Sequence, residues 1–171
     1  MSTLKVNAVT NLAAETPYQP TLMTAQASTS GTTIDFTGIP SWVKRITVMF
    51  NAVSTNGTSG ILIQIGAGSV TATGYVGQSN SISAVVTAFS TGFLVENNVL
   101  AANTHSGNVL LCLLGSNTWA ESGIVMPNTA ANYGCVSGGV LALGGVLDRV
   151  RITTVSGTDT FDAGSINVMY E

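Results

Sequence analysis

The sequence predicts an all-β protein, an antiparallel β-sandwich of jelly-roll-like form with an extended N-terminal arm. Ser, Thr and Asn supply 53 of the 171 residues, and Thr, Val and Ile are residues that favour strands. Clusters of Gly, Ser, Thr and Asn interrupt the chain about every 8–12 residues, which is the strand spacing of sandwiches and barrels. No window of about 12 residues carries an apolar helical stripe with caps at both ends. A closed barrel is the alternative architecture.

The chain divides into an arm, residues 1–30, and a head domain, residues 31–171. In the arm, Pro17 and Pro20 flank Tyr18, and the apolar residues are sparse beyond the alternating Leu4 and Val6. Proline holds a chain extended, and an alternating segment can add a strand to the sheet edge of a partner. We therefore predict that Leu4, Val6 and Tyr18 dock the arm onto a partner. A floppy tail is the other interpretation.

The first strands of the head are the clearest. In residues 32–37, Ile34 and Phe36 share one face, and the strand ends before Pro40. Residues 43–53 alternate, with Ile46, Val48 and Phe50 on one face. An Asn-Gly turn signal follows at residues 56–57, and residues 60–65 return as an apolar strand, so these two strands are predicted to form a hairpin. Further strands are predicted at residues 70–76, 81–89, 93–95, 108–114, 119–125, 136–143, 149–155 and 165–170.

Composition excludes several classes of function. Charged residues make up 8% of the chain, and the net charge is −3. Five Lys and Arg residues are too few to follow a phosphate backbone, which argues against nucleic-acid binding. The longest apolar runs, residues 109–114 and 140–147, are far short of the 20 or so that a membrane helix needs, which argues against membrane insertion. A surface with so few charges repels other copies weakly and suits an assembly of subunits.

No signal peptide is recognisable, because no apolar stretch of the required length follows Lys5. We expect the protein to be made in a cytoplasm and to leave it only inside a larger particle. The two cysteines do not form a disulfide framework. Cys112 lies in an apolar run and is predicted to be a buried free thiol, and a Cys112–Cys135 bridge is the alternative.

No constellation of residues predicts an enzyme, a metal site or a cofactor site. The single histidine, His105, has no Cys, Asp or Glu nearby at ligand spacing, and we interpret it as an exposed loop residue. Asp159 and Asp162 lie in a turn-rich segment, where Asp caps turns. Arg149 and Arg151 are two residues apart and therefore share a strand face. We expect them to pair with carboxylates of Asp148, Asp159 and Asp162.

Four aromatic residues are candidate glycan contacts, because aromatic rings can stack on sugars. They are Trp42, Trp119, Tyr75 and Tyr133. Packing in the core or in an interface is the other role that such residues take.

Three stretches resemble the β domain of tailed-phage and prophage tail-fibre and virion proteins. They are residues 34–51 (IDFTGIPSWVKRITVMFN), residues 61–66 with 73–75, and the C-terminal residues 147–171. Residues 2–7 (STLKVN) resemble the start of short phage fibre proteins, which dock to the particle by their N-termini. The resemblance implies a non-enzymatic virion appendage, usually a homotrimer, with an N-terminal attachment region and a distal β head.

The resemblance sets the expected function. We expect a bacteriophage structural protein of the tail-fibre type, located in the virion. Its arm would bind other virion proteins, and its head would self-associate and face the glycans of the host surface. The chain departs from the family in having no long shaft, which favours a capsid decoration (cement) protein as the alternative. A carbohydrate-binding module that uses the aromatic residues above is a further alternative.

Overall fold

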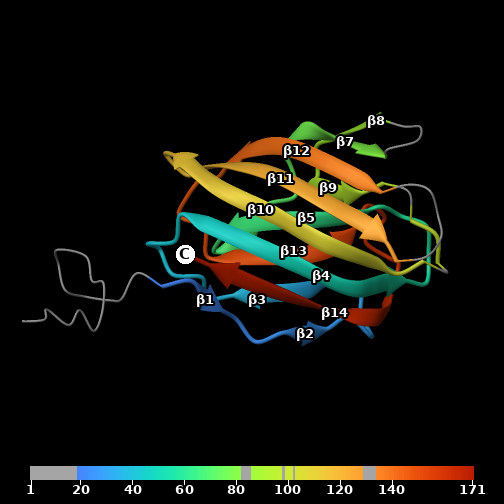
Figure 1. The fold of residues 1–171 in the computed structure, drawn as a ribbon. Coiled ribbons are helices and arrows are strands. Elements are labelled where there is room, and N and C mark those ends of the chain that lie inside the picture. Colours follow the sequence, from blue (N-terminus) through green and yellow to red (C-terminus); the bar gives the residue numbers. More distant parts are fainter. Residues whose placement is uncertain (1–18, 82–85, 98, 102, 129–133) are drawn as a thin grey trace, which may run out of the picture.

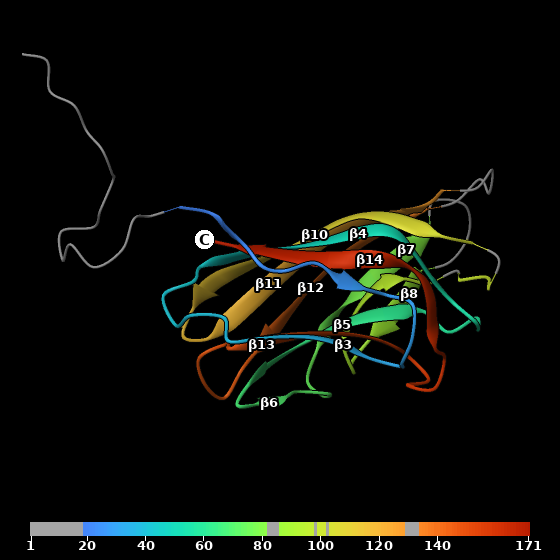
Figure 2. The same ribbon diagram turned by 90° about the horizontal axis from the view of Figure 1, so that it is seen from below.

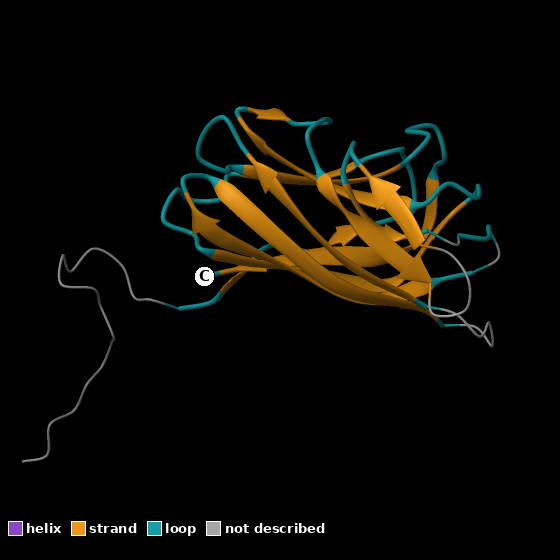
Figure 3. Cartoon of the chain, turned by 90° about the horizontal axis from the view of Figure 1, so that it is seen from above, coloured by secondary structure: helices purple, strands orange, loops and turns teal. Residues whose placement is uncertain are grey.

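Two antiparallel sheets pack face to face in the computed structural model, which describes residues 19–81, 86–97, 99–101, 103–128 and 134–171 (Figures 1 and 2). The described residues contain no helix (Figure 3). The predicted all-β sandwich is therefore confirmed, and the barrel alternative is wrong. The jelly-roll form stays a prediction.

Among the described residues, the larger sheet has nine strands and the smaller sheet has five. In spatial order the larger sheet contains β1 (Thr21–Leu22), β14 (Phe161–Tyr170), β4 (Arg45–Thr55), β10 (His105–Gly115), β11 (Thr118–Pro127), β12 (Cys135–Ala142), β7 (Val76–Ser81) and β8 (Val86–Phe89), with β2 (Gln26–Ala27) also on β14. The smaller sheet contains β3 (Ile34–Thr37), β13 (Arg149–Thr154), β5 (Ile61–Ala67) and β6 (Ser69–Val70), with β9 (Phe93–Glu96) also on β5.

Alternation along the strands builds the core between the sheets. In β4, Ile46, Val48 and Phe50 are buried, while Arg45 is exposed, as the pattern predicts. Strands β10 and β13 alternate in the same way through most of their length. The two inner faces together bury a continuous apolar cluster. Its largest fully buried apolar side chains include Phe36, Phe93, Phe161, Ile46, Ile63, Ile152 and Leu111.

The predicted hairpin of residues 43–53 and 60–65 is wrong. Strand β4 lies in the larger sheet between β14 and β10, whereas β5 lies in the smaller sheet beside β13. The connection between β4 and β5 crosses from the larger sheet to the smaller one, and its backbone bonds to the loop before β14. The Asn56 amide donates to the Thr160 carbonyl, and the Ser59 amide donates to Asp159 Oδ2, each at 2.9 Å.

The strand predicted at residues 70–76 is also wrong. Strand β6 ends at Val70, and residues 71–75 form a connection before β7 begins at Val76. Residues 72–74 of this connection are exposed, whereas the Tyr75 ring is buried in the core and only 2% exposed. The predicted strand 81–89 overlaps the end of β7 and all of β8, and residues 82–85 lie outside the described residues.

The head begins earlier than residue 31. Strands β1 and β2 pair with β14 at the edge of the larger sheet. Ser28 is fully buried, and its hydroxyl donates to the Ala163 carbonyl at 2.8 Å. Residues 21–28 therefore belong to the sandwich, although the sequence pattern groups them with the arm.

The sandwich has two distinct ends. The chain enters at residue 19 beside the C-terminus, since Thr21 pairs with Tyr170 (Figure 1). We call this the terminal end. At the opposite end, which we call the loop end, lie the connections after β4 and β9, before β12 and before β14.

Candidate functional site

The most unusual surface is the outer face of four neighbouring strands of the larger sheet. Strands β7, β10, β11 and β12 contain no Asp, Lys or Arg, and their one Glu and one His are both buried. We call their outward-facing residues the neutral face. It consists of Val76, Gln78, Asn80, Asn108, Leu110, Cys112, Leu114, Ala120, Ser122, Ile124, Met126, Val136, Gly138 and Val140.

Large apolar side chains are exposed on the neutral face. Val76 is 67% exposed, Ile124 51% and Val136 40%. Ile124 and Val136 are direct neighbours in the register of β11 and β12, so they form a raised apolar pair. Beside this pair is an open hollow of about 320 Å³. It is lined by Asn108, Leu110, Ser122, Gly123, Ile124, Val136 and Ser137.

The only charged residue of β4, the next strand of this sheet, is Arg45. It pairs with the Glu171 carboxylate next to the C-terminus. The Arg45–Glu171 ion pair therefore lies at one corner of the neutral face, and the outward-facing residues of the face itself carry no charge.

His105 is fully buried, so its interpretation as an exposed loop residue is wrong. It begins β10 and pairs with Val53 of β4 and Pro127 of β11 at the loop end. Its Nε2 lies 3.8 Å from Glu96 Oε2, which is beyond hydrogen-bonding distance. Burial lowers the pKa of His105, while the Glu96 charge and the Val53 backbone oppose this shift. At neutral pH this shift favours the uncharged imidazole.

Cys135 joins the same buried group. Its Sγ lies 3.0 Å from Glu96 Oε1 and 3.0 Å from Asn97 Oδ1. Burial is the main cause that raises the pKa of this thiol to about 12, which disfavours its thiolate form. Cys112 and Cys135 are both free. They lie on opposite faces of the larger sheet, which rules out the alternative of a bridge. Cys112 is half-buried, not buried as predicted.

A second buried carboxyl group lies on the inner face of β11. Glu121 is 4% exposed, and the Ser137 hydroxyl donates to its Oε1 at 2.6 Å. Burial raises the pKa of Glu121 to about 7, and the hydrogen bond from Ser137 limits this rise. The sequence analysis missed this glutamate, although strand alternation places it on the same face as Trp119 and Val125, which are both buried.

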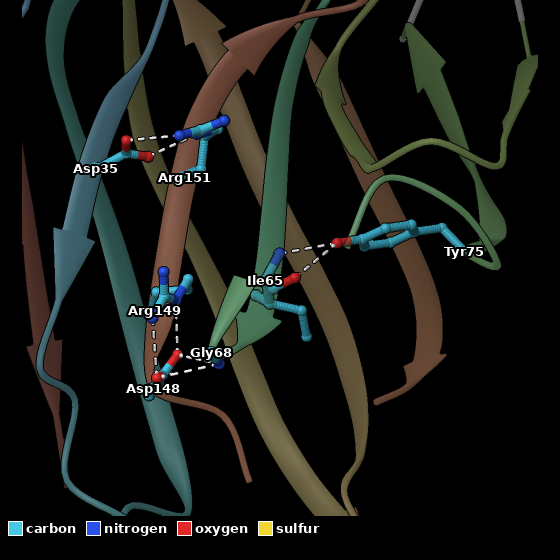
Figure 4. A network of polar contacts seen from close by, with 7 residues as sticks. All are labelled: Asp35, Ile65, Gly68, Tyr75, Asp148, Arg149 and Arg151. Atoms are coloured by element: carbon cyan, nitrogen blue, oxygen red, sulfur yellow. Dashed lines mark hydrogen bonds and ion pairs between the residues drawn. The ribbon is translucent and has the colours of Figure 1, made fainter. Parts of the chain in front are cut away.

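Arg149 and Arg151 lie on the same face of β13, as predicted, and both are paired (Figure 4). Arg149 Nε is 2.7 Å from Asp148 Oδ1, and the pair helps to lower the pKa of Asp148. Arg151 Nε is 2.7 Å from Asp35 Oδ1 on β3. The sequence analysis missed Asp35 as a partner, because the pairing of β13 with β3 joins residues 116 positions apart.

The pairing of Arg151 with Asp35 should contribute little to stability. A double-mutant cycle of Arg151→Ala and Asp35→Ala should give a coupling free energy of at most about 1 kcal/mol, because both side chains are about one-third exposed. The coupling should shrink in 1 M salt, where screening is strong. Urea unfolding of the four proteins measures it. A coupling that is well above this value and insensitive to salt would contradict the assignment as a surface pair.

Asp159 has the predicted turn role, whereas Asp162 lies in strand β14, and the expected pairing of both with the arginines is wrong. Asp159 accepts hydrogen bonds from the Ser59 amide and from the Ser156 hydroxyl, at 2.9 and 3.2 Å. Asp162 accepts a hydrogen bond from the Ser54 hydroxyl. Both therefore stabilise the loop end.

The candidate glycan contacts are not brought together. Tyr75 and Trp119 are each 2% exposed and present no ring face to a sugar, so their prediction as glycan contacts is wrong. Both rings fill the space between the sheets instead. Trp42 is 37% exposed and packs edge-to-face against Tyr170, with ring centroids 5.8 Å apart. Tyr133 lies outside the described residues, as do the predicted docking residues Leu4, Val6 and Tyr18.

Within the described ranges, no group of three His, Cys, Asp or Glu side chains is placed to hold a metal ion. The same ranges contain no helix of the length and apolar character needed to cross a membrane.

Comparisons of this chain with protein-family models, with curated proteins and with solved structures found no match.

Proposed function

We propose that this chain is a structural subunit of a bacteriophage virion, of the tail-fibre type, with an N-terminal arm that docks to the particle. The observation that carries the proposal is the placement of the chain entry. Residue 19 follows the segment with the fibre-like opening STLKVN and lies at the terminal end. Docking there leaves the loop end, with its four connections, pointing away from the particle. In this arrangement the head faces the host surface and packs against other copies, as a trimer.

Deleting residues 1–18 should abolish incorporation into particles without unfolding the head. Residues 19–171 contain the strands of both sheets and the apolar cluster between them, so we expect this part to fold by itself. We expect the truncated protein to keep the melting temperature of the full chain. The measurement is immunogold electron microscopy of particles that carry either the full or the truncated protein. If particles that carry the truncated protein are fully labelled, the arm is not the anchor.

A capsid decoration protein is the second candidate, and one feature favours it. Strands β1 and β2 lie flat against β14, so no shaft separates the chain entry from the head. A compact subunit of this shape fits a shell surface as well as a tail. The same immunogold labelling distinguishes the two, because label on the tail supports the fibre type and label on the capsid supports decoration.

A further inference from the structure

A hollow of about 310 Å³ lies on the outer face of the smaller sheet, where β5 and β13 reach the loop end. We call it the hydroxyl hollow, because its lining residues include Thr33, Gln64, Thr91, Arg151, Thr153 and Ser156. Its volume is at the lower end of the range for ligand pockets, so it suits one small ligand. We propose that the hydroxyl hollow binds one neutral sugar residue of a glycan. This inference rests on the proposed function, in which the loop end faces the host surface.

The hydroxyl hollow offers hydrogen-bond donors and acceptors that the protein does not use itself. The Thr33 and Thr91 side chains are exposed, and their hydroxyls make no hydrogen bond to another described residue. Gln64 is only 9% exposed, and its Nε2 donates to the Thr91 carbonyl at 2.8 Å. No described residue donates to Gln64 Oε1, yet this oxygen is not among the polar atoms that are buried without a partner. It is therefore an acceptor that is open to the hollow and held in a fixed position.

The charge of the hydroxyl hollow is balanced, which favours an uncharged ligand. Arg151 is the one charged residue among the described residues that line it. Arg151 Nε and Nη2 pair with the two carboxylate oxygens of Asp35, at 2.7 and 2.8 Å (Figure 4). This two-point contact fixes the guanidinium plane and leaves Nη1 as a donor without a partner among the described residues. A phosphate or a carboxylate ligand would meet the Asp35 charge next to the only cation.

The backbone at the hydroxyl hollow is already paired, which argues against a peptide. Leu62 pairs with Thr153 and Gln64 with Arg151 between β5 and β13, while β9 and β3 pair with the other edges of these strands. A peptide that binds by strand addition needs a free edge, so only side chains are left to recognise a ligand.

A sugar fits the groups that remain. None of the described residues that line the hydroxyl hollow is aromatic, so a nucleobase would find no ring on which to stack. A sugar residue carries several hydroxyls, each of which can both donate to Gln64 Oε1 and accept from Arg151 Nη1. Its C–H surface can contact the apolar side chains of Leu62 and Val155, which also line the hollow.

The test compares the full-length protein with Thr33→Met and with a matched control, Thr37→Met. Both threonines are exposed, but Thr33 precedes β3 and lines the hollow, whereas Thr37 ends β3 outside it. Arg151→Ala, which removes Nη1, is the second variant if Thr33→Met does not fold, and circular dichroism melting shows which variants are folded. Each protein is titrated with glucose, galactose and N-acetylglucosamine, and for comparison with glucuronate and inorganic phosphate. Single sugars are small ligands, so the titrations extend to about 50 mM, and amide chemical shifts in NMR spectra report binding.

We expect at least one of the three neutral sugars to shift the amide signals of Thr33, Gln64, Thr91 and Ser156 until they saturate. Thr37→Met should bind this sugar like the wild type. Thr33→Met and Arg151→Ala should each raise its dissociation constant about tenfold, because each removes a hydrogen-bonding group.

Three results would contradict the proposal. In the first, none of the neutral sugars shifts the signals of the hydroxyl hollow. In the second, the wild-type affinity survives in both folded variants. In the third, glucuronate or phosphate shifts the same signals at lower concentrations than the neutral sugars, which would make the hollow an anion site. None of these results bears on docking by the arm, which the deletion of residues 1–18 tests separately.

Discussion

Replacing Tyr75 by phenylalanine should lower the free energy of unfolding by about 1–3 kcal/mol, although only one oxygen is removed. The Tyr75 hydroxyl accepts a hydrogen bond from the Ile65 amide at 2.8 Å (Figure 4). It also donates a hydrogen bond to the Thr71 carbonyl at 2.9 Å. Strand β9 pairs with β5 at residues 61–63 and β6 pairs at residues 66–67. The hydroxyl therefore fills the gap between two partner strands on one edge of β5, and its loss leaves a buried amide without its acceptor.

The matched control is Tyr170→Phe. Tyr170 is also a tyrosine in edge-to-face contact with an aromatic ring, but it is only partly buried. Urea unfolding of both variants should show a clearly larger loss for Tyr75→Phe. Tyr75→Ala should cost about 3–5 kcal/mol, because it also leaves a cavity beside Phe93, whose ring centroid is 4.8 Å from that of Tyr75. Equal small losses for Tyr75→Phe and Tyr170→Phe would show that the hydroxyl does not support β5.

Alternation was sufficient to predict which residues of a strand face the core. Ile46, Val48 and Phe50 are buried as expected, and the class of fold is confirmed. Alternation does not determine which strand pairs with which, because it indicates only on which face of a sheet a residue lies and not which strand is the neighbour. The polar turn after β4 therefore looked like a hairpin, when its amides in fact bond to the loop before β14.

Burial of polar residues was the other limit of the sequence analysis. His105 stands among Asn, Thr, Ser and Gly, a context typical of loops, yet pairing with β4 and β11 buries it completely. Tyr75 was a candidate surface ring, but it is buried, and its hydroxyl accepts a hydrogen bond from Ile65, ten positions away. In both cases the buried side chain lies against another strand or turn, which the local sequence does not identify. The neutral face, by contrast, combines residues of four strands and becomes visible only when the sheet order is known.

The unfolding free energy should also depend on pH through Glu121, and Glu121→Gln should remove that dependence. The pKa of Glu121 is raised from 4.5 to about 7 by burial. Between these values the folded protein keeps a proton that the unfolded chain has lost. This contribution to stability is therefore complete below about pH 4.5, falls as pH rises toward 7, and is constant above that. The total change is on the order of 3 kcal/mol.

Glutamine is the informative replacement, because it keeps an oxygen that can accept the hydrogen bond from the Ser137 hydroxyl but cannot ionise. We expect Glu121→Gln to match the wild type within about 1 kcal/mol at pH 4 and to be more stable by up to about 3 kcal/mol at pH 8. Chemical unfolding at intervals between these pH values measures the difference. His105 has the opposite dependence, since its lowered pKa costs stability as pH falls, but it is present in both proteins and cancels in the comparison.

Glu171→Gln is the control, because Glu171 lies at the C-terminus and its carboxylate pairs with the exposed Arg45. Its effect on the unfolding free energy should be small, at most about 1 kcal/mol, because an ion pair with a half-exposed arginine contributes little. A difference for Glu121→Gln that is the same at pH 4 and pH 8 would mean that Glu121 ionises normally in the folded protein. In that case water reaches its carboxylate, and the interior between β11 and β12 is more open than its buried side chains indicate.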